Sequence, residues 1–235
     1  MFLAAVQGAT EFLPISSSGH LLLASELLRG ELNLKMAVLL HVGSLFAVLL
    51  FVRRSILRVF KDWKFLVNLV ISTIPAAFVG IFFEDLVERA FSSLFLLPLL
   101  FAINALVLTL ASLKNGDRSL EQMNVQHALL IGLFQAVAVF PGISRSGMAL
   151  SAALLLGYKR EEAVKYAFLM AIPVLAGASL LKLKGASIFM DLSFFVSFLS
   201  SLLALFVLRK VVLVGKLKVF ASYCLAVAFL VFVLG

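Results

Sequence analysis

Charged side chains are scarce in this 235-residue sequence, since Asp, Glu, Lys and Arg together make up only 14% of it. Hydrophobic residues make up 63%, and the mean hydropathy is +1.14. Soluble globular domains are about 45–50% apolar, so this composition excludes that class. It predicts an all-α polytopic membrane protein that lies in a lipid bilayer.

Cysteine is almost absent as well. The single cysteine, Cys224, rules out an internal disulfide and a cysteine-based metal cluster. The net charge of +8 is compatible with nucleic-acid binding. However, the basic residues lie in short segments between apolar runs, where orientation in the bilayer explains them, so we expect no nucleic acid.

The apolar runs are of two kinds. Six are long enough to span a membrane, at about 36–52, 64–83, 94–113, 162–182, 192–214 and 218–234. Two are interrupted: 1–28 is broken at Pro14 by the polar run Ser16 to His20, and 125–157 is broken at Pro141. Each arm of a broken segment has about half of the roughly 20 residues that a span requires.

The two broken segments resemble each other. An offset of 128 residues places Gln7 on Gln135, Phe12 on Phe140, Ser16 on Ser144, Ser18 on Ser146 and Gly19 on Gly147. At the same offset Ser17 aligns with Arg145, so the two tips differ in the chemistry of their side chains. We interpret the pattern as an internal repeat, about 1–113 and about 125–235, inside one integral membrane domain, 1–235.

The expected topology follows from the number of spans. If each broken segment is a re-entrant hairpin, three spans separate the repeats, and an odd number makes the repeats inverted. Fourteen of the twenty Lys and Arg residues then fall on one side, in the loops at 53–64, 114–124, 158–165 and 209–218. The positive-inside rule makes that side cytoplasmic. Treating the broken segments as full spans divides the charges more evenly, so the asymmetry favours hairpins.

The run from Val139 to Gly147 places Arg145 in the middle of an otherwise apolar segment. An arginine at membrane depth costs at least about 2.5 kcal/mol and generally serves a partner or a ligand. The helix break at Gly142 frees backbone N–H groups, and Ser144 and Ser146 add donors. This pattern predicts an anion site. The alternative is a kinked helix whose arginine extends to the surface.

The first tip carries the groups that suit catalysis. Gln7 and Glu11 lie four residues apart and share one helix face, and Glu11 is a single buried carboxylate. Ser17 is a candidate nucleophile, with His20 three residues further on. A carboxylate, a hydroxyl and an imidazole facing an arginine indicate nucleophilic or acid–base chemistry on a phosphate. The alternative is a polar network that braces two helix breaks.

These residues also resemble a family. QGATEFLPISSSGH, from Gln7 to His20, closely resembles the first signature of the bacterial undecaprenyl pyrophosphate phosphatases of the bacitracin-resistance type. PGISRSG, from Pro141 to Gly147, resembles the second, and the likeness covers nearly the whole chain. The resemblance implies hydrolysis of the lipid pyrophosphate to the carrier used in cell-wall synthesis, and an inverted repeat with two re-entrant hairpins and six spans. It also implies a divalent cation, Mg²⁺ or Ca²⁺, and a bacterial inner membrane with the site opening externally.

The resemblance implies a role for each signature residue. Glu11 matches a glutamate proposed as metal ligand or base, and Gln7 stands where many members have a second glutamate, so it is a tentative ligand. Ser17 matches the proposed nucleophile, and His20 the proposed acid/base or alternatively the nucleophile. Arg145 matches the pyrophosphate-binding arginine. Residues expected to contact the substrate with it are Ser16, Ser18, Gly142, Ser144 and Ser146.

A competing function and the oligomeric state stay open, and several other residues are expected to have structural roles. A transporter or flippase for a polyprenyl-phosphate lipid is the competing function, because inverted repeats with broken helices are typical of transporters. A homodimer is also left open. We expect His41 and His127 to serve helix packing or interface placement. Proline residues at 75, 98 and 173 are expected to kink spans.

Overall fold

The computed structural model describes residues 1–28, 34–59, 61–83, 85–86, 89, 94–182 and 191–234. Within these ranges the regular structure is helical, which confirms the predicted all-α class. The helices are α1 (Phe2–Phe12), α2 (Ser17–Leu27), α3 (Leu34–Val59), α4 (Trp63–Phe82), α6 (Leu97–Ser112), the 3₁₀ helix η1 (Leu120–Gln122), α7 (Val125–Val137), α8 (Arg145–Leu155), α9 (Arg160–Lys182), α10 (Leu192–Leu213) and α11 (Lys218–Leu234).

Four of these helices are long and apolar enough to cross a membrane: α3, α4, α9 and α10. The other two predicted spans, α6 and α11, have 16 and 17 residues and so fall slightly short of about 20. Pro75 and Pro173 lie inside helices, but the expectation for Pro98 was wrong. Pro98 lies in the first turn of α6, where a missing N–H costs nothing.

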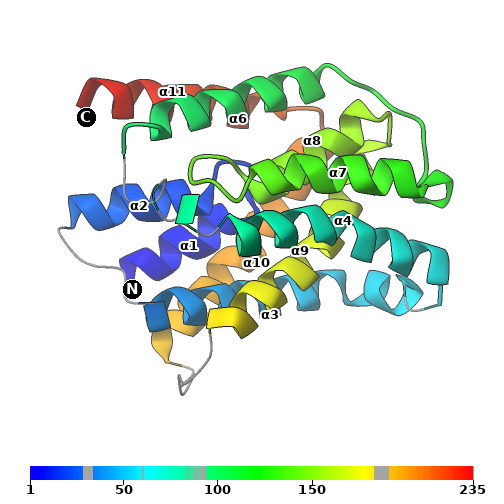
Figure 1. Ribbon diagram of the computed structural model, residues 1–235, viewed down its shortest axis with the longest axis horizontal. Coiled ribbons are helices and arrows are strands. Elements are labelled where there is room, and N and C mark those ends of the chain that lie inside the picture. The colour runs from blue at the N-terminus through cyan, green and yellow to red at the C-terminus, as the bar shows by residue number, and fades with distance from the viewer. Residues whose placement is uncertain are drawn as a thin grey trace.

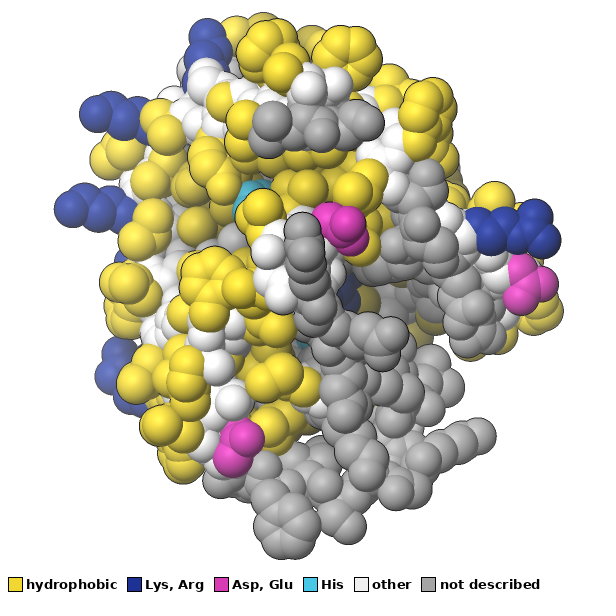
Figure 2. Space-filling view, turned by 90° about the vertical axis from the view of Figure 1, so that its left-hand side faces the viewer, with side chains coloured by type: hydrophobic (Ala, Val, Ile, Leu, Met, Phe, Trp, Pro, Cys, Tyr) yellow, Lys and Arg dark blue, Asp and Glu magenta, His cyan; other side chains and the backbone are white. Residues whose placement is uncertain are grey.

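Polarity is distributed as expected for a protein in lipid. Figure 2 views the end of the molecule where both termini lie, and hydrophobic side chains cover much of its described surface. Large side chains such as Phe206 and Phe229 are exposed, whereas polar ones such as Gln7, Ser44 and Asn104 are buried. In lipid, polar groups must find their partners inside the protein.

Proline and glycine explain the two helix breaks. Leu13 precedes Pro14 and is held in an extended conformation, with φ −65° and ψ 143°, so α1 ends there. In the second break Gly142 has a φ of +96°, which suits glycine and few other residues. Each break turns the chain directly into a new helix.

The two new helices begin with the same capping pattern. The hydroxyl of Ser16 accepts a hydrogen bond from the Gly19 N–H, and that of Ser144 accepts one from the Gly147 N–H, at 3.3 and 3.1 Å. Each cap hydroxyl also lies within hydrogen-bonding distance of the serine two residues further on. Local chemistry is therefore repeated at an offset of 128 residues.

Helices of the two halves of the chain interlock. The first broken segment contributes α1, which packs along α10, and the second contributes α7, which packs along α4. The last helices of the two halves, α6 and α11, pack against each other. In Figure 1, α1 and α2 extend inward from the end where both termini lie, α7 and α8 from the opposite end, and the two tips meet between them.

Several basic loops gather at the end opposite the termini. The N–H of Arg118 donates to the carbonyl of Gly157, and the Arg160 guanidinium donates to Asn115 Oδ1 at 2.6 Å. Arg209 is 3.5 Å from a carboxylate oxygen of Glu161. These contacts place the loops at 114–124, 158–165 and 209–218 together, as the sequence predicts.

Candidate active site

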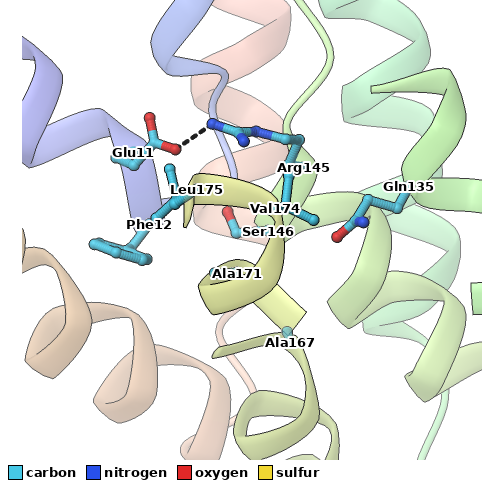
Figure 3. Close-up of a pocket in the computed structure, with 9 residues that line it drawn as sticks. All are labelled: Glu11, Phe12, Gln135, Arg145, Ser146, Ala167, Ala171, Val174 and Leu175. Atoms are coloured by element: carbon cyan, nitrogen blue, oxygen red, sulfur yellow. Dashed lines mark hydrogen bonds and ion pairs between the residues drawn. The ribbon is translucent and has the colours of Figure 1, made fainter. Parts of the chain in front are cut away.

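The carboxylate of Glu11, in the last turn of α1, is the centre of the site. Its side chain is only 4% exposed. One oxygen pairs with the guanidinium of Arg145, as Figure 3 shows. The other accepts hydrogen bonds from Gln7 Nε2 and Ser17 Oγ, each at 2.6 Å. The structure thus brings together four residues that the sequence analysis assigned to the site.

Backbone and serine groups join the two tips around this carboxylate. Ser16 Oγ accepts a hydrogen bond from the N–H of Gly142 at 3.0 Å. In the opposite direction, the hydroxyls of Ser144 and Ser146 each donate to the carbonyl of Leu13 at 3.3 Å. The predicted substrate-contacting serines therefore lie at the meeting point of the tips, close to Arg145.

Glycine at position 19 allows this close approach. A Cβ added there would lie 2.7 Å from a ring atom of Phe101 and 3.0 Å from the N atom of Gly142. Gly147 in the second tip has a matching environment, because its added Cβ would lie 3.0 Å from Pro14. Each tip therefore presents a glycine to the other tip.

Asn104 of α6 holds both tips at once, and the sequence analysis did not identify it. Its Nδ2 donates to the carbonyl of Pro14 at 2.9 Å, and its Oδ1 accepts from the N–H of Ser144 at 3.0 Å. The same amide lies 3.3 Å from Cys224 Sγ on α11. The available signal was a lone asparagine in the apolar run 94–113.

His20 lies in the first tip, but its hydrogen bonds lead away from Ser17. Its Nδ1 is 2.7 Å from the carbonyl oxygen of Ser16, so this nitrogen carries the proton. In the neutral imidazole Nε2 is then the acceptor, and it lies 2.7 Å from the hydroxyl of Tyr223, which donates to it. The Tyr223 ring also stacks on the imidazole. Tyr223 is a second residue that sequence spacing did not identify.

The expectation for His41 was wrong, because the structure places it at the site. His41 Nε2, on α3, is 3.9 Å from the oxygen of Glu11 that also accepts from Ser17. His127 remains outside, as expected, and bonds through Nδ1 to the hydroxyl of Tyr158 at 2.7 Å. The residues next to His41 and His127 in the sequence did not indicate which of the two lies at the site.

A small cavity of about 10 Å³ lies beside the ion pair, with room for about one water molecule. Its polar lining comes from Glu11, Gln135, Arg145 and Ser146. Its apolar wall comes mainly from α9, through Ala167, Ala171, Val174 and Leu175 (Figure 3). The cavity thus has hydrogen-bond donors and a carboxylate on one side and an apolar wall on the other.

The donor set suits a hard divalent cation only in part. Among the described residues, no three His, Cys, Asp or Glu side chains are grouped closely enough to hold a metal ion. However, Gln7 Oε1 is buried without a hydrogen-bond partner in the described structure, next to the Glu11 carboxylate. An amide oxygen and a carboxylate fit Mg²⁺ or Ca²⁺ when phosphate oxygens complete the shell.

Comparisons with known proteins show what the chain is similar to over nearly its whole length. The model of the family described as Bacitracin resistance protein BacA matches residues 1–230. A protein of Thermotoga petrophila named undecaprenyl-diphosphatase is 44% identical, over 100% of this chain and 99% of its own length. Proteins with the same name from Thermosipho africanus and Methanococcus maripaludis are 40% and 41% identical, over at least 98% of this chain and 97% of theirs.

Asn104→Leu is expected to lower the thermal stability of the purified protein, because it leaves the N–H of Ser144 buried without a partner and leaves the carbonyl of Pro14 with only the 3.8 Å contact from Cys224 Sγ. Each such loss costs about 1–3 kcal/mol. Thermal unfolding in detergent micelles measures the effect. Thr109→Val is the control in the same helix, since that hydroxyl bonds only to the carbonyl of Ala105 within α6. Equal unfolding midpoints for the two variants would contradict a bracing role for Asn104.

Proposed function

The chain belongs to the family of bacitracin resistance protein BacA, and we infer that it is an undecaprenyl-diphosphatase. It hydrolyses undecaprenyl diphosphate to undecaprenyl phosphate and inorganic phosphate, and so recycles the lipid carrier of cell-wall synthesis. The observation that carries this function is the hydrogen bond from Ser17 to Glu11, with Arg145 on the same carboxylate. A transporter or flippase needs no hydroxyl bonded to a base, so we favour hydrolysis over transport.

We propose that Arg145 binds the diphosphate. One of its nitrogens pairs with Glu11, and the guanidinium has five N–H donors in a planar fork that suits phosphate oxygens. Its side chain is 25% exposed, whereas that of Glu11 is 4% exposed, so an anion reaches the arginine more easily than the carboxylate. The start of α8, at Arg145, adds backbone N–H groups and a favourable helix dipole.

We propose that Ser17 attacks the terminal phosphorus. Its Oγ–H already points at Glu11 Oε2, 2.6 Å away, so the carboxylate accepts the proton as the oxygen–phosphorus bond forms. The bond to the bridging oxygen breaks, and the lipid monophosphate leaves with the proton that Glu11 accepted, so that Glu11 is again a carboxylate. Water then hydrolyses the phosphoserine and releases phosphate, with Glu11 again available as the base.

Binding of the substrate prepares Glu11 for this role. In the structure Arg145 compensates the negative charge of Glu11. When the guanidinium turns toward phosphate oxygens, the carboxylate loses part of that stabilisation and becomes a better proton acceptor. Hydrogen bonds from Gln7 and Ser17 keep the carboxylate in place meanwhile.

We also propose a divalent cation, Mg²⁺ or Ca²⁺, held by Glu11 and by the unpartnered Oε1 of Gln7. It supplies positive charge that offsets the charge of the phosphate oxygens. In the structure Gln7 orients Glu11 through its amide N–H, and its Oε1 would be available to the cation.

We propose that the two broken segments are re-entrant hairpins of an inverted repeat in the bacterial inner membrane, with the site opening to the periplasmic side. Two observations support this. The backbone hydrogen bond between Arg118 and Gly157 places both ends of 125–157 at the same end of the molecule. In addition, α1 packs along α10 and α7 packs along α4, which is the pairing that a two-fold relation between repeats requires.

Arg145→Lys is expected to lower kcat by about 100-fold or more while the protein remains folded, because lysine keeps the charge but loses the two-pronged donor geometry. Phosphate release from a polyprenyl diphosphate, with and without a chelator, measures it. Arg209→Lys, in an exposed ion pair with Glu161, is the matched control and should retain wild-type turnover. Near-normal turnover of Arg145→Lys would show that no bidentate contact exists.

A rapid-quench experiment with substrate labelled on its terminal phosphate tests the nucleophile. If Ser17 attacks, His20→Ala should still form an acid-stable phosphoenzyme and Ser17→Ala should form none. Label in Ser17→Ala that acid destroys and base preserves would instead identify His20 as the nucleophile. Absence of label in the wild type and in both variants would rule out a covalent mechanism.

Orientation is tested with single cysteines in a Cys224→Ser background, which keeps a hydrogen-bonding group beside Asn104. Cysteine at Leu27, an exposed residue at the end of α2, should react with an impermeant thiol reagent added to intact cells. Cysteine at Arg54, exposed near the end of α3, should resist it. The reverse labelling pattern would overturn the proposed orientation.

A further inference from the structure

Gln135, on α7, is 2% exposed, and its Nε2 has no hydrogen-bond partner among the described residues. Buried donors without partners are rare in native proteins, and each calls for an explanation. The equivalent residue in the first half, Gln7, donates to Glu11 four residues later. Four residues after Gln135 the chain has Val139, which offers no side-chain acceptor. The amide N–H is therefore left available for a ligand.

Gln135 lines the same cavity as the groups proposed to bind the anion. Gln135, Arg145 and Ser146 line the cavity together. In Figure 3 the side chain of Gln135 extends from α7 toward the labelled residues of α8 and α9. An amide from α7 and a guanidinium from α8 thus line one space, together with the Ser146 hydroxyl, whose proton goes to the carbonyl of Leu13.

The protein's own acceptor in this cavity is already engaged. Glu11 accepts from Gln7 and Ser17 on one oxygen and pairs with Arg145 on the other. The wall from α9 offers only apolar side chains, among them Ala171 and Val174. A phosphate group brings acceptor oxygens of its own, so it satisfies this donor when it enters the cavity beside Arg145.

We propose that Gln135 Nε2 donates a hydrogen bond to a diphosphate oxygen of the substrate, beside Arg145. The proposal rests on the proposed function and adds a binding residue to it. It also explains why the two repeat-related glutamines differ: Gln7 leaves its oxygen unpartnered and Gln135 leaves its nitrogen unpartnered. One end of the diphosphate site thus offers an acceptor for a cation, and the other a donor for an anion.

Binding of farnesyl methylenediphosphonate, which cannot be hydrolysed, to the purified full chain in detergent tests this. Gln135→Met keeps the size and removes the donor, and it should raise Kd by about tenfold. Gln135→Glu keeps the shape and places a carboxylate near phosphate oxygens, so its Kd should rise at least as much. Ser151→Ala is the matched control: that hydroxyl is also buried without a described partner but does not line the cavity, and its loss should leave Kd unchanged.

Thermal unfolding of each variant, together with KM for farnesyl diphosphate, completes the test. A Gln135→Glu or Gln135→Met protein that unfolds like the wild type and binds the analogue with wild-type Kd would overturn the proposal. If instead the wild type neither binds the analogue nor releases phosphate from a polyprenyl diphosphate, the proposed function itself fails. The two failures are therefore distinguishable in one set of samples.

Discussion

The ion pair between Glu11 and Arg145 is the interaction on which the rest of the site depends. It joins the two polar tips, which lie 134 residues apart in the chain, inside a protein whose surface is largely apolar. Removing one partner of such a pair leaves an uncompensated buried charge, at a cost of about 3–5 kcal/mol. The two charges therefore stabilise each other at the meeting point of the tips.

Backbone groups that the helix breaks expose hold this ion pair in place. Carbonyls of Leu13 and Pro14 in the first tip accept hydrogen bonds from Ser144, Ser146 and Asn104. In the membrane no water satisfies such groups, so the tips must satisfy each other. The helix breaks therefore create the site and also fix the relative position of its two tips.

Local signals in the sequence were sufficient for the helix breaks and for the charged centre. Proline and glycine specify where helices stop, so the breaks at Pro14 and Gly142 were predicted correctly. Glu11 and Arg145 were identified because a charge in an apolar run needs a partner or a ligand. These signals do not depend on how distant helices pack.

Residues whose roles depend on packing were not predictable. Asn104, His41 and Tyr223 reach the tips from α6, α3 and α11, and nothing in their local sequence specifies that approach. His20 shows the reverse case. It lies three residues from Ser17, yet its imidazole bonds to the carbonyl of Ser16 and to Tyr223.

An experimental structure with bound farnesyl methylenediphosphonate tests the central claim most directly. We expect the diphosphonate to lie between the two tips, with the guanidinium of Arg145 on its oxygens and Ser17 Oγ next to its terminal phosphorus. Glu11 should then keep its hydrogen bond from Ser17 but no longer be the main partner of Arg145. A diphosphonate bound away from the tips, with the Glu11–Arg145 ion pair unchanged, would contradict the account.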